Sequence, residues 1–342
     1  MTNYLDMKKV LVTGITGFIG QHCAAELLKH GYAVKGSLRN LAKKEEVIKG
    51  IKKVIDPKGN IEFCQLDLLK DNGWAEAMQD CEFVLHVASP YFTSEPKDPS
   101  DLIKPAVEGT LRALKAAKQA GIKRVVLTSS IVAMLEDIKG TVAINHNSWT
   151  NVEAKNATAY VKSKTLAEKS AWDFIKNQDK EQPLELVVIN PGSVYGPTLT
   201  GDLSGESMTS FAKLISGKMP LLPRISINMS DVRDIAQIHV AALENKSANG
   251  QRFIVATEKN YSIKELAQLA KSNGYEKVST KLAPNFLLKL MAPFNSDLKG
   301  LLPFIGNTFI ADVSNTMKTF NWKPISLEKT VKDTSQSITE NL

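Results

Sequence analysis

The stretch KVLVTGITGFIG, Lys9–Gly20, decides the fold. A short β-branched run leads into glycines at positions 14, 17 and 20, and the 3.6-residue apolar periodicity that follows predicts a helix. In such a strand–turn–helix unit the first glycine allows a tight turn, the second lets backbone N–H groups approach a pyrophosphate, and the third lets the helix pack on the strand. Because a helix N-terminus also presents unpaired N–H groups to anions, the stretch predicts a dinucleotide site.

Five further apolar or β-branched runs have the length of strands and alternate with segments of helical periodicity. They are Ala33–Leu38, Ile61–Leu66, Phe83–Val87, Arg124–Thr128 and Glu185–Asn190. Strands that alternate with helices indicate βαβ units and a parallel sheet. Near-continuous apolar strands favour a sheet covered on both faces. We therefore predict an α/β chain with a Rossmann-type, doubly wound parallel sheet.

The alternation ends near residue 191, and region 196–230 is rich in proline and glycine. Beyond it the periodicity predicts one strand, Arg252–Ala256, and the helices Asp231–Leu243, Ser262–Ser272, Pro284–Leu290 and Leu327–Ile338. We interpret residues 1–192 as the dinucleotide-binding domain, to which 229–257 returns. Residues 193–228 and 258–342 form a smaller, substrate-binding part.

Composition excludes several classes of protein. The 342 residues are 43% hydrophobic and 23% charged, as in globular domains. The net charge of +7 is spread along the chain instead of forming the focused basic face that nucleic-acid binding requires. Cys23, Cys64 and Cys81 form no CxxC pair, which indicates a reducing compartment. With neither a signal-peptide pattern nor an apolar run of membrane-spanning length, we predict a cytoplasmic protein without a membrane partner.

The residues after the second predicted strand bear on the choice of cofactor. A ribose 2′-hydroxyl is usually recognised there by Asp or Glu, but the chain has Ser37-Leu38-Arg39-Asn40 and no acid before Glu45. The planar guanidinium of Arg39 suits a phosphate, and Lys43 and Lys44 add positive charge. We therefore predict NADPH over NADH.

Tyr160 and Lys164 belong to a predicted helix over Thr158–Asn177 and, at i and i+4, share one of its faces. A neighbouring ammonium favours the phenolate, so we expect it to lower the pKa of Tyr160 and to suit the phenol for proton donation. Ser129 and Ser130 follow the predicted strand Arg124–Thr128, at the edge where ligands of open α/β sheets bind. A serine hydroxyl there can donate a hydrogen bond to a carbonyl oxygen.

Over about residues 8–256, six motifs resemble, in order and spacing, those of the extended short-chain dehydrogenases/reductases. They are TGITGFIG (13–20), HVASP (86–90), KDPSDLIKPAVEGT (97–110), VVLTSS (125–130), YVKSKTLAEKSAW (160–172) and INPGSVYGP (189–197). The third and fifth motifs most resemble the dihydroflavonol-4-reductase-like branch, which includes plant dihydroflavonol and cinnamoyl-CoA reductases and microbial aldehyde and ketone reductases. The resemblance implies an NADP-dependent oxidoreductase.

The resemblance also implies roles for individual residues. Ser130 would hold the substrate carbonyl oxygen, Tyr160 would be the general acid, and Lys164 would bridge the nicotinamide ribose hydroxyls. The motifs and the basic cluster together give the expected cofactor-binding residues, which are Thr13, Gly14, Thr16, Gly17, Phe18, Ile19, Gly20, Arg39, Lys43, Lys44, Asp67, Leu68, Val87, Ala88, Ser89, Thr128, Tyr160, Lys164, Pro191, Gly192, Ser193 and Val194.

Three positions depart from the family patterns. Ala106 stands where many superfamily members have a proton-relay Asn, so any relay must differ. Leu135 stands where plant dihydroflavonol reductases have a ring-recognising Asn, which argues against a dihydroflavonol substrate. No Cys accompanies Tyr160, unlike the cinnamoyl-CoA reductase signature. The residues expected to line the substrate pocket are mostly apolar, which favours an aldehyde, a ketone or a keto ester, and they are Tyr91, Phe92, Ile131, Val132, Tyr195, Leu199, Met208 and Phe211.

We therefore predict a reductase that transfers a hydride from NADPH to a small-molecule carbonyl substrate. One alternative is an NAD-dependent sugar-nucleotide epimerase or dehydratase, and another is a hydroxysteroid dehydrogenase of the same fold. An alternative of a different class is a non-catalytic NADPH sensor. The five histidines are scattered, so no metal site is expected, and the sequence is compatible with a monomer or a homodimer.

Overall fold

A computed structural model describes residues 7–90, 96, 98–137, 139–292 and 296–341. Its centre is a seven-stranded sheet in the order β11-β7-β5-β4-β1-β2-β3, in which every neighbouring pair is parallel. The strands are β1 (Lys9–Thr13), β2 (Ala33–Leu38), β3 (Ile61–Gln65), β4 (Phe83–His86), β5 (Arg124–Thr128), β7 (Glu185–Pro191) and β11 (Arg252–Val255). The strand order reverses between β1 and β4, which is where ligands bind in such sheets.

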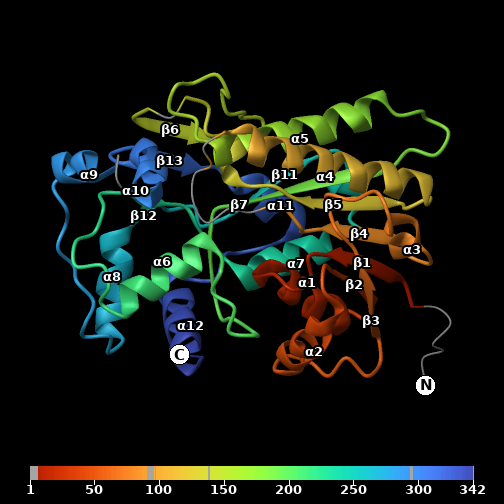
Figure 1. The fold of residues 1–342 in the computed structure, drawn as a ribbon, viewed down its shortest axis with the longest axis horizontal. Coiled ribbons are helices and arrows are strands. Elements are labelled where there is room, and N and C mark those ends of the chain that lie inside the picture. The colour runs from red at the N-terminus through yellow and green to blue at the C-terminus, as the bar shows by residue number, and fades with distance from the viewer. Residues whose placement is uncertain (1–6, 91–95, 97, 138, 293–295, 342) are drawn as a thin grey trace.

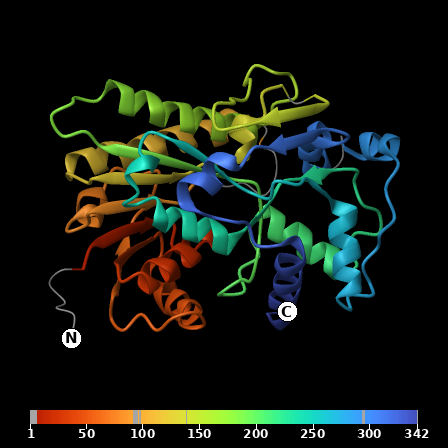
Figure 2. The same cartoon turned by 180° about the vertical axis from the view of Figure 1, so that it is seen from behind.

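Helices cover both faces of the sheet, and each face has its own hydrophobic cluster (Figures 1 and 2). The covering helices are α1 (Phe18–Lys29), α2 (Lys44–Lys52) and α7 (Val232–Ala241) on one face and α3 (Trp74–Met78), α4 (Ser100–Gln119) and α5 (Ala159–Asn177) on the other. In the part of the chain that the structure describes, none of the helices is long and apolar enough to cross a membrane. The predicted Rossmann-type sheet is confirmed.

The central strands form where the apolar runs predict them because both sides of each strand are buried. Val10, Leu11 and Val12 in β1 are all 0% exposed, and all four residues of β4 are buried. Such continuous burial requires the unbroken apolar runs seen in the sequence instead of alternation. The predicted and observed strand ends differ by at most one residue, as at β3, which ends at Gln65.

A smaller part lies beyond the carboxyl edge of the sheet and has a separate hydrophobic core (Figure 1). Its core helices are α6 (Glu206–Ile215), α8 (Ile263–Ser272) and α12 (Leu327–Glu340). Short strand pairs connect it to the sheet: β8 (Ser193–Tyr195) with β10 (Met229–Asp231), and β9 (Ser226–Ile227) with β12 (Tyr261–Ser262). This part also contains α9 (Asn285–Met291), α10 (Ser296–Leu301) and the 3₁₀ helix η5 (Leu302–Phe304).

Three further 3₁₀ helices lie in the segments around the central sheet, and they are η1 (Leu41–Lys43), η2 (Ile131–Met134) and η3 (Lys246–Ala248).

One late segment packs against the first domain, although the sequence analysis assigned all of 258–342 to the smaller part. Strand β13 (Thr308–Ala311) pairs in parallel with β6 (Thr141–Ile144). The following helix, α11 (Ser314–Phe320), contacts β11, and the rings of Phe253 and Phe320 are 4.8 Å apart. The chain therefore crosses back over the sheet before α12, and the division into two domains stays a proposal.

The third glycine of the first turn gives a test of this architecture. A Cβ on Gly20 would overlap the carbonyl oxygen of Gly14 and lie 3.0 Å from the Ile15 Cα, so helix α1 could no longer pack on the turn. We expect Gly20→Ala to lower the free energy of unfolding by about 1–3 kcal/mol, as measured by urea denaturation. Gly205→Ala, where a Cβ would enter open space, is the control and should change it by less than about 0.5 kcal/mol. Equal effects of the two variants would contradict the close packing.

Candidate active site

The parallel arrangement brings most of the predicted site residues to one edge of the sheet. Strands β1, β2, β4, β5 and β7 all end there. The segments that follow them contain the glycine turn, Arg39, the loop 87–89, the pair Ser129–Ser130 and the segment 192–194. Residues far apart in the sequence are therefore neighbours at this edge.

The turn after β1 has the features of an anion site. Gly14 has a φ of +68°, and a Cβ on it would lie 3.0 Å from the Cα of Ala88, so the turn approaches the loop after β4 closely. The Gly17 N–H donates to the Gly14 carbonyl at 2.9 Å. Helix α1 then begins with neither a side-chain cap nor an acidic residue in its first turn. Its first N–H groups are therefore open to a pyrophosphate, which fits the predicted dinucleotide.

Two buried side chains hold this turn against β4. The Thr13 Oγ1 accepts a hydrogen bond from the Ala88 N–H at 3.1 Å and lies 2.9 Å from the Nδ1 of His86. Burial lowers the pKa of His86 to about 4, and the charge of Lys164 lowers it further. His86 is therefore neutral near pH 7, and its hydrogen bond with the Thr13 hydroxyl has a structural role.

The residues predicted to bind the 2′-phosphate of NADPH are exposed at the end of β2. Arg39 directly follows the strand, and Lys43 and Lys44 lie at the junction of η1 and α2. Within the described residues, the only hydrogen bond recorded for Arg39 is the one that its backbone carbonyl accepts from Gln65. The guanidinium can therefore bind a phosphate without losing an internal partner.

Tyr160 and Lys164 lie in the first two turns of α5, where the Thr158 Oγ1 caps the helix by accepting from the Val161 N–H at 3.3 Å. The Lys164 Nζ is 5.9 Å from the centroid of the Tyr160 ring and donates to the Ser89 Oγ at 2.9 Å. Burial lowers the pKa of Lys164 to about 8, so it still carries its proton at neutral pH. An ammonium has three protons, and the donors not used on Ser89 suit the two hydroxyls of a ribose.

Ser130 is 8% exposed and lies between β5 and the 3₁₀ helix η2. Its Oγ caps η2 by accepting from the Val132 N–H at 3.4 Å. Because η2 packs against α5, Ser130 sits beside the helix that carries Tyr160 and Lys164. The structure thus brings the strand end and the helix together, and the catalytic roles of the three residues stay predictions.

Several other predicted cofactor residues have structural partners. The Thr128 Oγ1 is 2.7 Å from the Nε2 of His239 on α7, and the Gly192 N–H donates to the Ser230 Oγ at 2.8 Å. The Asp67 Oδ1 accepts from the Leu69 N–H at 3.0 Å. These contacts fix the loops, and a role of the same residues in cofactor binding stays a prediction.

The residues predicted to line the substrate pocket are dispersed. Tyr91 and Phe92 lie outside the described residues. Ile131 and Val132 pack in the cluster on one face of the sheet, and Leu199 is 5% exposed. The remaining three belong to the core of the smaller part and are Tyr195, Met208 and Phe211. Their contact with a substrate stays a prediction.

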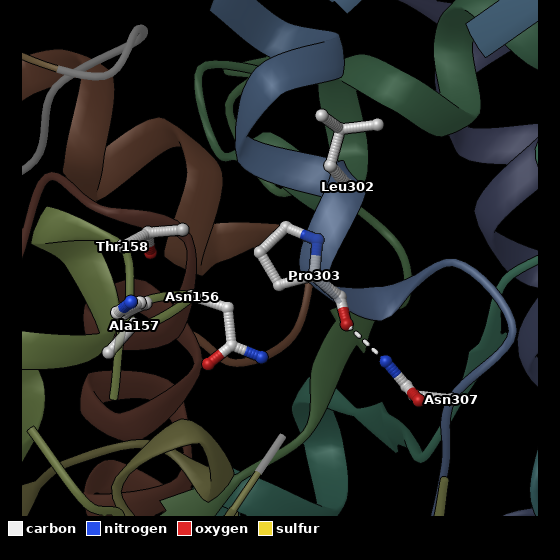
Figure 3. Close-up of a pocket in the computed structure, with 7 residues that line it drawn as sticks. Asn156, Ala157, Thr158, Leu302, Pro303 and Asn307 are labelled. Atoms are coloured by element: carbon white, nitrogen blue, oxygen red, sulfur yellow. Dashed lines mark hydrogen bonds between the residues drawn. The ribbon is translucent and has the colours of Figure 1, made fainter. Parts of the chain in front are cut away.

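A cavity of about 480 Å³ lies directly before α5 and was not anticipated from the sequence (Figure 3). One wall is the segment 155–158, which ends two residues before Tyr160. The other wall comes from Leu302, Pro303 and Asn307, and Pro303 accepts a hydrogen bond from the Asn307 amide at 2.6 Å. No local motif marks residues 302–307, so only the fold shows that they reach this place.

The fold and the edge geometry together define a dinucleotide-binding α/β enzyme of the short-chain dehydrogenase/reductase type. The model of the NAD dependent epimerase/dehydratase family matches residues 10–256. The chain belongs to this family, and the predicted membership of the extended short-chain dehydrogenases/reductases is confirmed.

Named relatives agree with this assignment. Cinnamoyl-CoA reductase CAD2 of Medicago truncatula is 36% identical over 74% of this chain and 77% of the relative. The NADPH-dependent methylglyoxal reductase GRE2 of Saccharomyces cerevisiae is 32% identical over 72% of this chain and 77% of its own. The crystal structure of Gre2 from Candida albicans in complex with NADPH superposes with a TM-score of 0.78 at 27% identity, covering 98% of this chain and 99% of the other. These relatives confirm the predicted enzyme class, an NADP-dependent oxidoreductase.

The burial of Lys164 predicts an unusual pH dependence of stability. Lys164 loses its proton near pH 8 in the folded chain and near pH 10.5 when unfolded. Between these values the unfolded chain binds more protons, so the wild type gains stability as pH rises relative to a variant without the ammonium. We expect Lys164→Met to be more stable than the wild type at neutral pH and to lose this advantage towards pH 10.5, as measured by urea unfolding of the ligand-free protein.

The partly exposed Lys162 on the same helix gives the matched control, Lys162→Met. A difference in stability between wild type and Lys164→Met that stays constant from neutral pH to pH 10.5 would contradict the buried ammonium.

Proposed function

We propose that the chain is an NADPH-dependent reductase of small, mainly apolar carbonyl compounds, with Ser130, Tyr160 and Lys164 as its catalytic residues. The observation that carries the proposal is the placement of Lys164. Its side chain is partly buried, and the ammonium lies at the carboxyl edge of the sheet, beside the Tyr160 ring and bonded to Ser89 of the loop after β4. A cation withdrawn from water is costly unless it is paired, so its position here favours a ligand whose hydroxyl groups accept hydrogen bonds from the ammonium.

In this proposal the side chains bind and protonate the carbonyl group. The Ser130 hydroxyl donates a hydrogen bond to the carbonyl oxygen and orients it. The Tyr160 Oη donates its proton to that oxygen as negative charge develops there, and the nearby Lys164 ammonium stabilises the resulting phenolate. When bound, NADPH supplies the hydride that the carbonyl carbon accepts.

The cavity before α5 is the proposed approach for the substrate. Its lining combines the apolar Ala157, Leu302 and Pro303 with the polar Asn156, Thr158 and Asn307 and with one cation, Lys155. A mixed surface with a single cation suits a small compound with one or two oxygen atoms better than a sugar nucleotide, whose diphosphate would call for several cations. This supports an aldehyde, a ketone or a keto ester. The cytoplasmic location and the absence of a nucleic-acid partner stay predictions from composition.

The first test removes the proposed proton donor. Tyr160→Phe should lower kcat for the NADPH-dependent reduction of an aldehyde and ketone panel about 10²- to 10⁴-fold, because general acid catalysis typically contributes that much. The Kd for NADPH, measured by the quenching of protein fluorescence, should change little. The control is Tyr32→Phe, which removes a phenol whose hydroxyl donates to Glu244 at 2.7 Å.

Two outcomes would reject the proposal. One is a wild-type protein that oxidises NADPH with no member of the panel. The other is a Tyr160→Phe variant that retains the wild-type kcat.

A second test concerns cofactor choice. Arg39→Ala should weaken the binding of NADPH about 10- to 100-fold, the loss expected for charge-assisted hydrogen bonds to a 2′-phosphate, while NADH binding changes little. Isothermal titration of the variant with both dinucleotides measures the difference. Lys53→Ala, an exposed cation near the end of α2, is the control. Equal losses for NADPH and NADH would show that Arg39 does not read the 2′-phosphate.

A further inference from the structure

A buried carboxylate lies on the same helix as the catalytic pair and is not used in the proposed chemistry. Glu168 is 1% exposed, and both of its oxygens accept hydrogen bonds. Oε2 accepts from the Ser129 Oγ at 2.5 Å and from the Asn190 Nδ2 at 2.8 Å. Oε1 accepts from the Arg252 Nε at 2.5 Å and from the Trp172 indole N–H at 3.3 Å. We call Glu168, Ser129, Asn190 and Arg252 the Glu168 network.

Arg252 supplies the balancing charge and is itself held firmly. It is 7% exposed, and its Nη1 donates to the backbone carbonyls of Ser148 at 2.6 Å and His146 at 3.1 Å. Its guanidinium carbon lies 3.7 Å from the centroid of the Trp149 ring. A buried ion pair returns its desolvation cost only when its remaining polar atoms are also satisfied, and among the described residues the Arg252 Nη2 has no hydrogen-bond partner. The pair is therefore poor evidence for added stability and better evidence for a fixed arrangement.

The network joins the two parts of the active site. Ser129 directly precedes Ser130, and the Asn190 Nδ2 also donates to the Ser130 carbonyl oxygen at 3.1 Å. Glu168 stands four residues after Lys164 and eight after Tyr160 on α5, so the three side chains project from one side of the helix. The Ser130 backbone is thereby tied on two sides to the helix that carries the proton donor.

From these contacts we infer that the Glu168 network positions Ser130 relative to Tyr160. The inference rests on the proposed function, because it assigns the network to the same carbonyl chemistry. Glu168 is not assigned a catalytic role, since donors from the protein occupy both of its oxygens. A misplacement of about 1 Å between reacting groups can cost about 100-fold in rate, so a rigid link of this kind has kinetic consequences.

The opposite edge of the sheet offers a comparison. There Arg124 at the start of β5 pairs with Glu185 at the start of β7, with Nη2 and Oε2 2.6 Å apart. That pair already joins the two strands, so the strands do not require Glu168 to stay together. What the Glu168 network adds is a connection from the strand ends to α5.

The experiment uses Ser129→Ala, which removes one hydrogen bond and no charge, and Glu168→Gln, which removes the charge. Each should lower kcat at least about 10-fold at a temperature well below its own Tm, with the KM for NADPH changed less than about threefold. Ser129→Thr keeps the hydroxyl and should restore most of kcat. Glu185→Gln is the matched control and should lower Tm without changing kcat. A merely structural role would affect Tm and leave kcat unchanged.

A kcat of Ser129→Ala within about twofold of the wild type would overturn the inference, even where Tyr160→Phe is inactive and the proposed function stands. If the wild type reduces no carbonyl compound, the proposed function fails. Crystal structures of wild type and Ser129→Ala with NADPH then test whether the Glu168 network positions Ser130. Displacement of Ser130 relative to α5 would support the inference. An unmoved Ser130 would overturn it. Should Glu168→Gln fail to fold, Ser129→Ala carries the test alone.

Discussion

The reversal of strand order between β1 and β4 is the constraint on which the rest of the site depends. Because β2 lies on one side of β1 and β4 on the other, α1 and α4 leave the carboxyl edge towards opposite faces of the sheet. The edge between them is left open, and the first turn can approach the loop after β4. Only a residue without a side chain allows that approach, since a Cβ on Gly14 would meet Ala88. The glycine turn is thus required by packing, independently of its predicted role in phosphate binding.

Among the described residues, several charged side chains withdrawn from water lie at boundaries between elements. Lys164 and the Glu168 network join α5 to the strand ends. On the opposite face, Asp234 accepts from the Trp322 indole at 3.1 Å and from the Ile325 N–H at 2.8 Å, which fastens the last crossing of the chain to α7. Burial raises the pKa of Asp234 to about 6, so this contact is made at some cost in desolvation. These charged groups fix the relative positions of the elements more than they raise the free energy of unfolding.

Sequence patterns predict the central strands well because continuous burial leaves a continuous apolar run. The pairing of β6 with β13 joins residues more than 160 apart, and four-residue strands at the surface have too little burial to mark them. The bond between Glu168 and Arg252 spans 84 residues and was equally invisible. One signal for Glu168 was present: its i+4 spacing from Lys164 places it on the same face of the helix, which is turned towards the sheet.

The glycine-turn side and the cavity side of the site are therefore built from different kinds of group. The side predicted to bind the dinucleotide is built from backbone groups of the glycine turn and of the start of α1. The side of the cavity is built from side chains such as Asn156 and Leu302 on segments far apart in the chain. The family model ends at residue 256, before the segment 302–307 that forms one wall of the cavity. If the cavity receives the substrate as proposed, substitutions in this late segment can alter the choice of substrate while the glycine turn and the Glu168 network stay in place.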